Sequence, residues 1–172
     1  KAITSLFALE RLGAGHRFAT RVLATGPLQG GVVQGDLILA GGGDPTLQTD
    51  QLGDLVARLA TTGLKGATGR FLYWDAALPR ALHVARDQPA HVGYNPAISG
   101  LNLNFNRVHF EWKRAGGDWA VAMDARGERF LPGVQMVGMR VQRRETPLFT
   151  YAMEDAREDW TVAAAALGKD GS

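Results

Sequence analysis

The stretch LILAGGGDPTLQTDQL, from Leu37 to Leu52, constrains the fold of this chain more than any other. It is typical of a short apolar strand, followed by three glycines, an Asp-Pro turn and the start of an amphipathic helix. Glycines supply positive φ angles and allow backbones to approach closely, and Pro45 stops the strand. We therefore predict a strand, a compact turn over residues 41–45 and a helix.

These glycines do not fit a phosphate-binding loop. A P-loop requires Gly, four residues and then Gly-Lys-Ser/Thr, and no lysine stands at that spacing here. The dinucleotide-binding motif requires a third glycine at the position that Thr46 occupies. The carboxylate of Asp44 would also repel an anion. The sequence thus argues against nucleotide binding.

The segments on both sides of the turn predict a strand, helix and strand unit. Helical spacing continues from Thr49 to Gly63, and GRFLYWD predicts a second strand that ends at Asp75. Upstream, residues 17–26 and 32–40 have the composition of a β-hairpin.

The beginning of the chain has the pattern of a helix without a start signal. The apolar residues at helical spacing before Gly13 are Ile3, Leu6, Phe7 and Leu12. No Ser, Thr, Asp or Asn precedes them as an N-cap, because the pattern begins directly after Lys1. We expect a helix that has been cut in its middle.

The second half of the chain changes character. Residues 76–96 show little periodicity and predict an irregular connection, and the region from 107 to 166 contains five strand-like stretches separated by Gly, Asp and Pro. Such stretches suggest a small antiparallel sheet domain, and the whole chain is therefore assigned to the α+β class.

Composition excludes several classes of function. The net charge is only +2, which argues against a nucleic-acid partner, and no apolar run is long enough for a membrane span. Cysteine is absent, so thiol chemistry and cysteine-type zinc sites are excluded. The histidines lack the spacing of metal ligands: His16, His83, His91 and His109. We expect neither a metal nor a cofactor.

Three segments, which begin at Lys1, Gly35 and Tyr94, together resemble one family: KAITSLFALERLGAGHRFATRV, GDLILAGGGDPTL and YNPAISGLNLNFNRVHFEW. The family is the serine-type D-alanyl-D-alanine carboxypeptidases of peptidase family S13, of the penicillin-binding protein 4 type. The resemblance extends to about residue 112 and is weaker beyond it. It implies a fragment of a penicillin-binding-protein, serine β-lactamase-like enzyme with inserted strand-rich domains.

The resemblance implies a catalytic role for Lys1. In the family, the nucleophilic serine begins an S-x-x-K motif, and Lys1 stands where that lysine belongs. Residues three apart share a helix face, so a lysine amine can accept the proton of the serine. The serine itself would precede Lys1 by three positions.

The resemblance also implies a substrate-binding role for Asp75. A carboxylate at the end of a G-x-h-x-h-D strand (h apolar) is associated in the family with the amino group of the peptidoglycan stem side chain, and Asp75 matches it. The family often continues D-x-S-x-F, whereas this chain has DAALP. A strand-end Asp is by default a turn or cap residue, and both interpretations remain open.

By the same resemblance, residues 1–25 belong to the catalytic domain, 26–112 to an inserted α/β domain and 113–172 to a β-rich subdomain. The parent protein is expected to cleave peptidoglycan stem peptides through an acyl-serine in the bacterial periplasm, and β-lactam antibiotics would acylate the same serine. The motifs S-x-N and K-T-G are absent, so the 172-residue chain alone is expected to be inactive. The alternative is a non-catalytic module that binds peptidoglycan or a partner.

Overall fold

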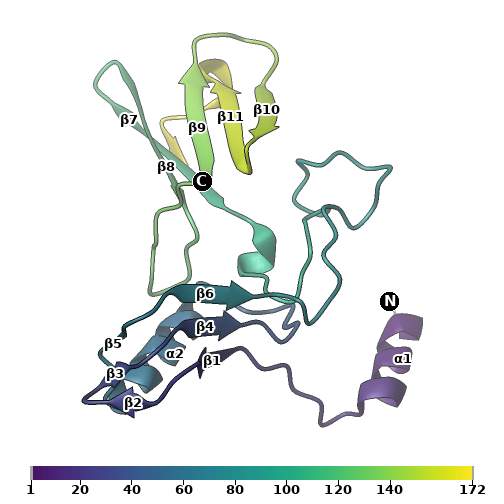
Figure 1. Ribbon diagram of the computed structural model, residues 1–172. Helices are drawn as coiled ribbons and strands as arrows, with labels where there is room; N and C mark the ends of the chain where they lie inside the picture. Colours follow the sequence, from purple (N-terminus) through teal and green to yellow (C-terminus); the bar gives the residue numbers. More distant parts are fainter. Residues whose placement is uncertain (1, 172) are drawn as a thin grey trace. The chain divides into compact units, whose positions relative to one another are not determined.

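The computed structural model describes residues 2–171, and its internal contacts divide the chain into two compact units (Figure 1). Unit 1 consists of Lys1–Asp44, Gly66–Arg80 and Ser99–Leu101. Unit 2 consists of Pro45–Lys65, Ala81–Ile98 and Asn102–Ser172. The domain boundaries after residues 25 and 112 stay predictions.

Unit 1 contains the strands that the glycine-rich stretch predicts. Its main sheet has the order β1 (Arg21–Ala24), β4 (Leu37–Ala40) and β6 (Phe71–Trp74). Strand β1 is antiparallel to β4, which confirms the predicted hairpin, and β4 is parallel to β6. A second small sheet joins β2 (Leu28–Gln29), β3 (Val32–Val33) and β5 (Gly66–Ala67).

The predicted N-terminal helix is present as α1 (Ala2–Leu12). It ends at Gly13, which has a φ of +83° and donates its N–H to the carbonyl of Leu9 at 2.9 Å. No described residue of α1 is buried, so its apolar side chains are exposed on this chain.

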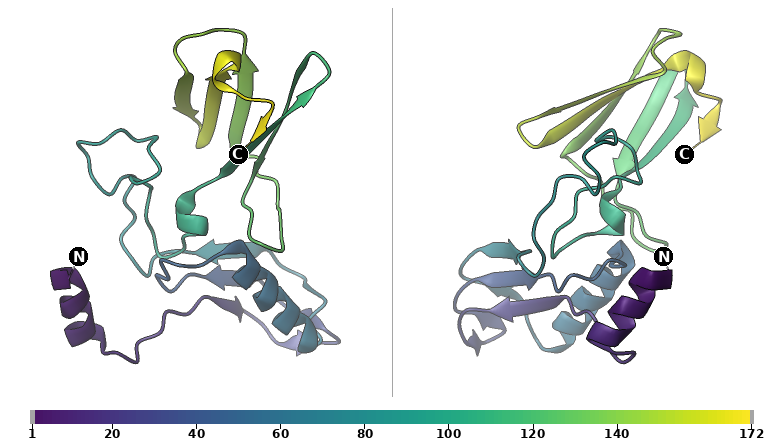
Figure 2. Two further views of the ribbon diagram at one scale, coloured as in Figure 1. Left: turned by 180° about the vertical axis from the view of Figure 1, so that it is seen from behind. Right: turned by 90° about the vertical axis from the view of Figure 1, so that its right-hand side faces the viewer.

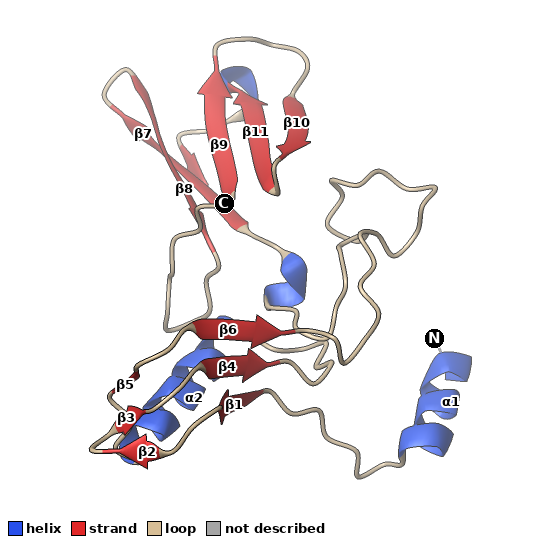
Figure 3. Ribbon diagram, in the orientation of Figure 1, coloured by secondary structure: helices blue, strands red, loops and turns tan. Residues whose placement is uncertain are grey.

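Unit 2 combines one helix with two three-stranded sheets, which Figure 3 shows in red. Helix α2 (Thr49–Thr61) begins where the sequence predicts it, and Gln51 Oε1 accepts the N–H of Gln48 at 2.7 Å. The predicted apolar positions Leu52, Leu55 and Leu59 are half-buried, and Val56 is exposed.

The strands of unit 2 are coloured from teal to yellow in Figure 2. Their bounds lie close to the predicted stretches. One sheet has the order β12 (Asp170–Gly171), β7 (His109–Ala115) and β8 (Asp118–Asp124). The other has the order β10 (Phe149–Glu154), β11 (Arg157–Ala163) and β9 (Val137–Gln142). The short helices η1 (Asn104–Asn106) and η2 (Ala164–Ala166) complete the unit.

The prediction of an antiparallel sheet domain was wrong in one respect, because β9 and β11 run parallel. The reason lies in the turn between β10 and β11, where Asp155 and Ala156 both have positive φ angles. This tight turn pairs β10 antiparallel with one edge of β11, so β9 takes the other edge. The chain reverses direction between β9 and β10 and again between β10 and β11, and β9 and β11 therefore point the same way. Strand β12 was not predicted.

The connection from residue 81 to 98 is irregular, as predicted, and it is organised by one fully buried side chain, Asn95. The amide of Asn95 accepts the N–H of Ala85 at 2.8 Å and donates to the carbonyl of Ala85 at 2.9 Å. It also donates to the carbonyls of Gln88 and Pro89, each at 3.3 Å. A bridge between Ala81 and Ile98 closes the base of this loop.

Candidate substrate-binding site

The two predicted site residues have different outcomes. Lys1, the predicted catalytic residue, lies outside the described residues. Asp75 is described, and it directly follows Trp74, the last residue of β6. Its position at a strand end is as predicted, and its role in binding substrate stays a prediction.

Asp75 is partly accessible and paired with an arginine of the same unit. Its Oδ2 lies 2.7 Å from Nη2 of Arg80. The side chain of Asp75 is 22% exposed and that of Arg80 is 62% exposed. The carboxylate of Asp75 is therefore accessible to solvent, but its Oδ2 already accepts a hydrogen bond from the Arg80 guanidinium.

The glycine run fixes the backbone at Asp75 through a chain of hydrogen bonds. Gly41 N–H donates to the carbonyl of Trp74 at 2.9 Å, and Gly43 N–H donates to the carbonyl of Gly100 at 2.8 Å. Gly100 N–H in turn donates to the carbonyl of Asp75 at 2.7 Å. The ends of β4 and β6 and the segment 99–101 are thus tied together around Asp75.

These contacts leave no room for side chains. A Cβ placed on Gly41 would lie 2.3 Å from the carbonyl oxygen of Gly100, and one on Gly100 would lie 2.4 Å from that of Asp75. A Cβ on Gly42 would lie 2.3 Å from the carbonyl oxygen of Ala19, and Gly43 has a φ of +79°. The glycine run therefore serves close backbone packing and so positions Asp75.

Two further residues complete the site. Because side chains alternate along a strand, Phe71 and Tyr73 point to the same side of β6, and Asp75 follows the strand in the same alternation. Tyr73 is 65% exposed, so its ring is open to solvent. The hydrogen bond to Asp75, and to a smaller degree the nearby Tyr73 side chain, raises the pKa of Arg80 above its usual range. The candidate site thus consists of the aromatic side chains of Phe71 and Tyr73 and, after the strand, the ion pair between Asp75 and Arg80.

Sequence reasoning found Asp75 but missed Tyr73 and Arg80. The period of two along the strand could have indicated Tyr73. Arg80 lies in the irregular connection after β6, where no periodic pattern predicts which way a side chain points.

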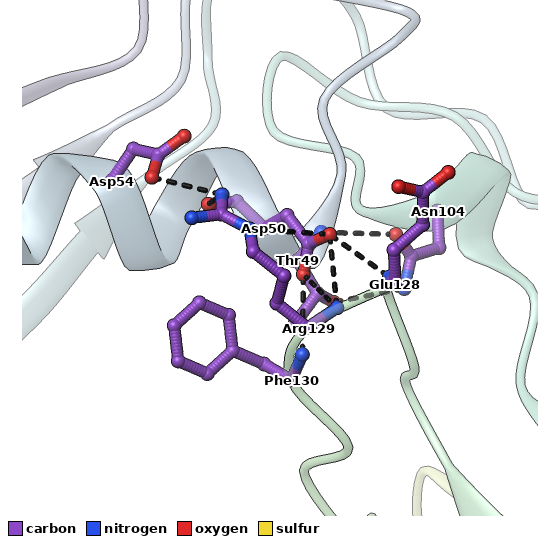
Figure 4. Close-up of polar contacts among 7 residues, drawn as sticks. All are labelled: Thr49, Asp50, Asp54, Asn104, Glu128, Arg129 and Phe130. Atoms are coloured by element: carbon purple, nitrogen blue, oxygen red, sulfur yellow. Dashed lines mark hydrogen bonds and ion pairs between the residues drawn. The ribbon is translucent and has the colours of Figure 1, made fainter.

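Unit 2 contains a second polar cluster, which Figure 4 shows. The carboxylate of Asp50 accepts backbone N–H groups of Glu128, Arg129 and Phe130 at 2.9, 3.1 and 3.2 Å. Burial opposes ionisation of Asp50, but these hydrogen bonds outweigh it and lower its pKa. Arg129 also pairs with Asp54 at 2.8 Å. Since loop backbone groups occupy the Asp50 carboxylate, the cluster fastens the loop to α2 and has a structural role.

Other types of site have no counterpart in the part of the chain that the structure describes. No three His, Asp or Glu side chains between residues 2 and 171 gather in a way that could hold a metal ion. Over the same residues, no helix combines the length and apolar character that crossing a membrane requires.

Comparison with known proteins relates this chain to one group of enzymes. A curated relative, the D-alanyl-D-alanine carboxypeptidase of Actinomadura sp. (strain R39), is 45% identical over 76 residues, which are 44% of this chain and 14% of that protein. A crystal structure of penicillin binding protein 4 (dacB) from Haemophilus influenzae is 21% identical, with a TM-score of 0.70 over 97% of this chain and 38% of that one.

A second structure of the same Haemophilus influenzae protein, in complex with a novel β-lactam, has a TM-score of 0.62 and covers 98% of this chain and 35% of that one. The chain thus spans less than half the length of the proteins it matches. At 21% identity these structures establish the fold alone, which is of the predicted α+β class. The sequence profile of the D-Ala-D-Ala carboxypeptidase 3 (S13) family matches residues 1–132, which is most of the chain. The predicted resemblance is therefore confirmed, and the chain belongs to the S13 family.

Proposed function

We propose that this chain is part of a serine-type D-Ala-D-Ala carboxypeptidase or endopeptidase that acts on peptidoglycan stem peptides in the bacterial periplasm. Membership of the S13 family supports the reaction class. The observation that carries the proposal for this chain is the partly exposed carboxylate of Asp75 at the end of β6. It lies within the region that the family profile matches.

The proposed reaction needs no metal or organic cofactor. A serine three residues before Lys1 gives its proton to the lysine amine, and its oxygen attacks the carbonyl carbon of the penultimate D-alanine. Hydrogen-bond donors of the parent protein stabilise the oxyanion, and the C–N bond breaks as the leaving D-alanine takes up the proton. Water then hydrolyses the acyl-serine. β-Lactams acylate the same serine, and the complex of penicillin binding protein 4 with a β-lactam supports this.

The proposed role of Asp75 is to bind the ammonium group on the side chain of the stem peptide. A carboxylate and an ammonium form a charge-assisted hydrogen bond, and Asp75 is accessible enough to make one. Binding energy gained at this remote group positions the scissile bond, so its loss lowers turnover as well as affinity.

The test uses the full-length parent enzyme and two stem peptides that differ only in whether the side-chain amine is free or acetylated. Asp75→Asn should lower kcat/KM for the free-amine peptide and leave the acetylated peptide unaffected. Asp36→Asn is the matched control, because Asp36 also pairs with an arginine of unit 1, Arg70, at 3.3 Å. An equal loss on both peptides would assign Asp75 a structural role only.

A second test concerns the nucleophile. A fluorescent penicillin should label the parent protein covalently and leave the isolated 172-residue chain unlabelled, because that sequence contains neither a serine before Lys1 nor S-x-N or K-T-G. Stoichiometric labelling of the isolated chain would show that the nucleophile has been misplaced. A parent that binds peptidoglycan without being labelled would instead favour the non-catalytic module.

A further inference from the structure

The carboxylate proposed to bind the substrate already has an internal cation. Arg80 Nη2 lies 2.7 Å from Asp75 Oδ2, and Arg80 is the more exposed partner, at 62% against 22%. Arg80 therefore neutralises part of the carboxylate charge from a position that is itself open to solvent. An ammonium at the same carboxylate would lie beside the like-charged guanidinium, so each cation weakens the binding of the other.

The ion pair positions Arg80 but does not fix it, because the arginine is exposed to solvent. Its hydrogen bond to Asp75, at 2.7 Å, is the one that holds it, and the Tyr73 side chain near the guanidinium adds to the rise in the pKa of Arg80. A guanidinium stays charged at all physiological pH values, so protonation does not release it. An exposed ion pair is weak because water and salt screen it, so a substrate cation can displace it.

We propose that Arg80 is a specificity-determining residue, which competes with the substrate ammonium for Asp75 and so moderates the preference for stem peptides with a free amine. This inference rests on the proposed role of Asp75. In the wild-type enzyme, binding exchanges one ion pair for another, and Arg80 moves into solvent. Without Arg80, binding creates a new ion pair at a free carboxylate.

The experiment measures, in the full-length parent enzyme, the ratio of kcat/KM for the free-amine peptide to that for the acetylated peptide. Arg80→Gln should raise this ratio about two- to fivefold, which is the range expected for an exposed ion pair. The rise should disappear in the double variant with Asp75→Asn, because no carboxylate is left to compete for. Arg70→Gln, which removes an exposed arginine paired with Asp36, should leave the ratio unchanged.

Salt provides an independent readout. The KM of wild type for the free-amine peptide should change little between low and high salt, since one screened pair replaces another. The KM of Arg80→Gln should rise with salt, since binding then forms an additional pair. Tyr73→Phe removes a lesser contributor at Arg80, so it should raise the same kcat/KM ratio by a smaller factor than Arg80→Gln. This variant replaces Arg80→Gln in the test if Arg80→Gln fails to fold.

The outcomes separate the two proposals. If Asp75→Asn lowers the ratio while Arg80→Gln and Tyr73→Phe leave it unchanged, the inference about Arg80 is overturned and the proposed function stands. If Arg80→Gln lowers the ratio, Arg80 orients Asp75 for the substrate and does not compete with it. If Asp75→Asn leaves the ratio unchanged in both backgrounds, the proposed role of Asp75 fails, and the inference fails with it.

Discussion

Replacement of Asn95 should show how much of the irregular connection depends on one side chain. Asn95 is fully buried and satisfies backbone groups of Ala85, Gln88 and Pro89. Asn95→Ala removes all these hydrogen bonds and leaves the N–H of Ala85 without its partner. Asn95→Asp keeps the acceptor for Ala85 but turns the NH₂ donor into an oxygen that faces three carbonyls.

The expected loss of local stability can be worked out from the hydrogen bonds of Asn95. The two hydrogen bonds to Ala85, at 2.8 and 2.9 Å, are each worth about 1 kcal/mol net, and an unsatisfied buried N–H costs about 1–3 kcal/mol. The two bonds at 3.3 Å contribute less. We expect Asn95→Ala to cost about 2–4 kcal/mol of local stability. Asn95→Asp should cost more at neutral pH, because it also buries a charge among carbonyl oxygens.

Amide hydrogen exchange at Ala85 and limited proteolysis within residues 85–89 measure this local opening directly. Asn106→Ala is the control, because Asn106 also donates to a backbone carbonyl, that of Ala97, but is exposed. If Asn95→Ala protects the Ala85 amide as well as wild type does, or if the Asp variant is more stable than the Ala variant, the reasoning is refuted.

The close packing at Gly41 and the ion pair between Arg126 and Asp124 should both affect stability measurably. Gly41→Ala should lower the free energy of unfolding by about 1–3 kcal/mol, because the new Cβ would meet the Gly100 carbonyl. Gly15 has open space around it, so Gly15→Ala should leave that free energy nearly unchanged. Chemical denaturation measures both values. Hydrogen bonds from Arg126 lower the pKa of Asp124 despite its burial, so its contribution to stability should be complete at neutral pH and be lost as the pH falls below about 4. Arg126→Gln should flatten the stability profile between pH 5 and 2, and unchanged profiles would contradict this assignment.

Local patterns in the sequence predicted most elements of this fold. Glycine, proline and apolar spacing indicated β4, the turn after it and α2, because each of those signals acts over a few residues. The parallel pairing of β9 with β11 was not predictable in this way, because it depends on which edge of β11 remains free. Short β12 has a partner distant in sequence and no periodicity of its own.

The candidate site was predictable to the same limited extent. Asp75 was found because it ends a strand in a family-like motif, and Tyr73 shares its strand. Arg80 pairs with Asp75 from a segment without regular structure, so only the three-dimensional structure reveals the ion pair. The long-range contact between Gly41 and Gly100 likewise gave the glycine run a purpose that its sequence alone left open.

The discontinuity of unit 1 has a consequence for the order of folding during synthesis. Its three segments, Lys1–Asp44, Gly66–Arg80 and Ser99–Leu101, are separated by residues that belong to unit 2. The hydrogen bonds of Gly100 to Gly43 and Asp75, just beyond the ends of β4 and β6, cannot form until Gly100 has left the ribosome. Closing so long a loop also costs chain entropy. A nascent chain that ends before Gly100 should therefore carry the β1, β4 and β6 sheet without the segment that ties its strand ends together. The unfinished unit would be exposed to proteases and chaperones for that time.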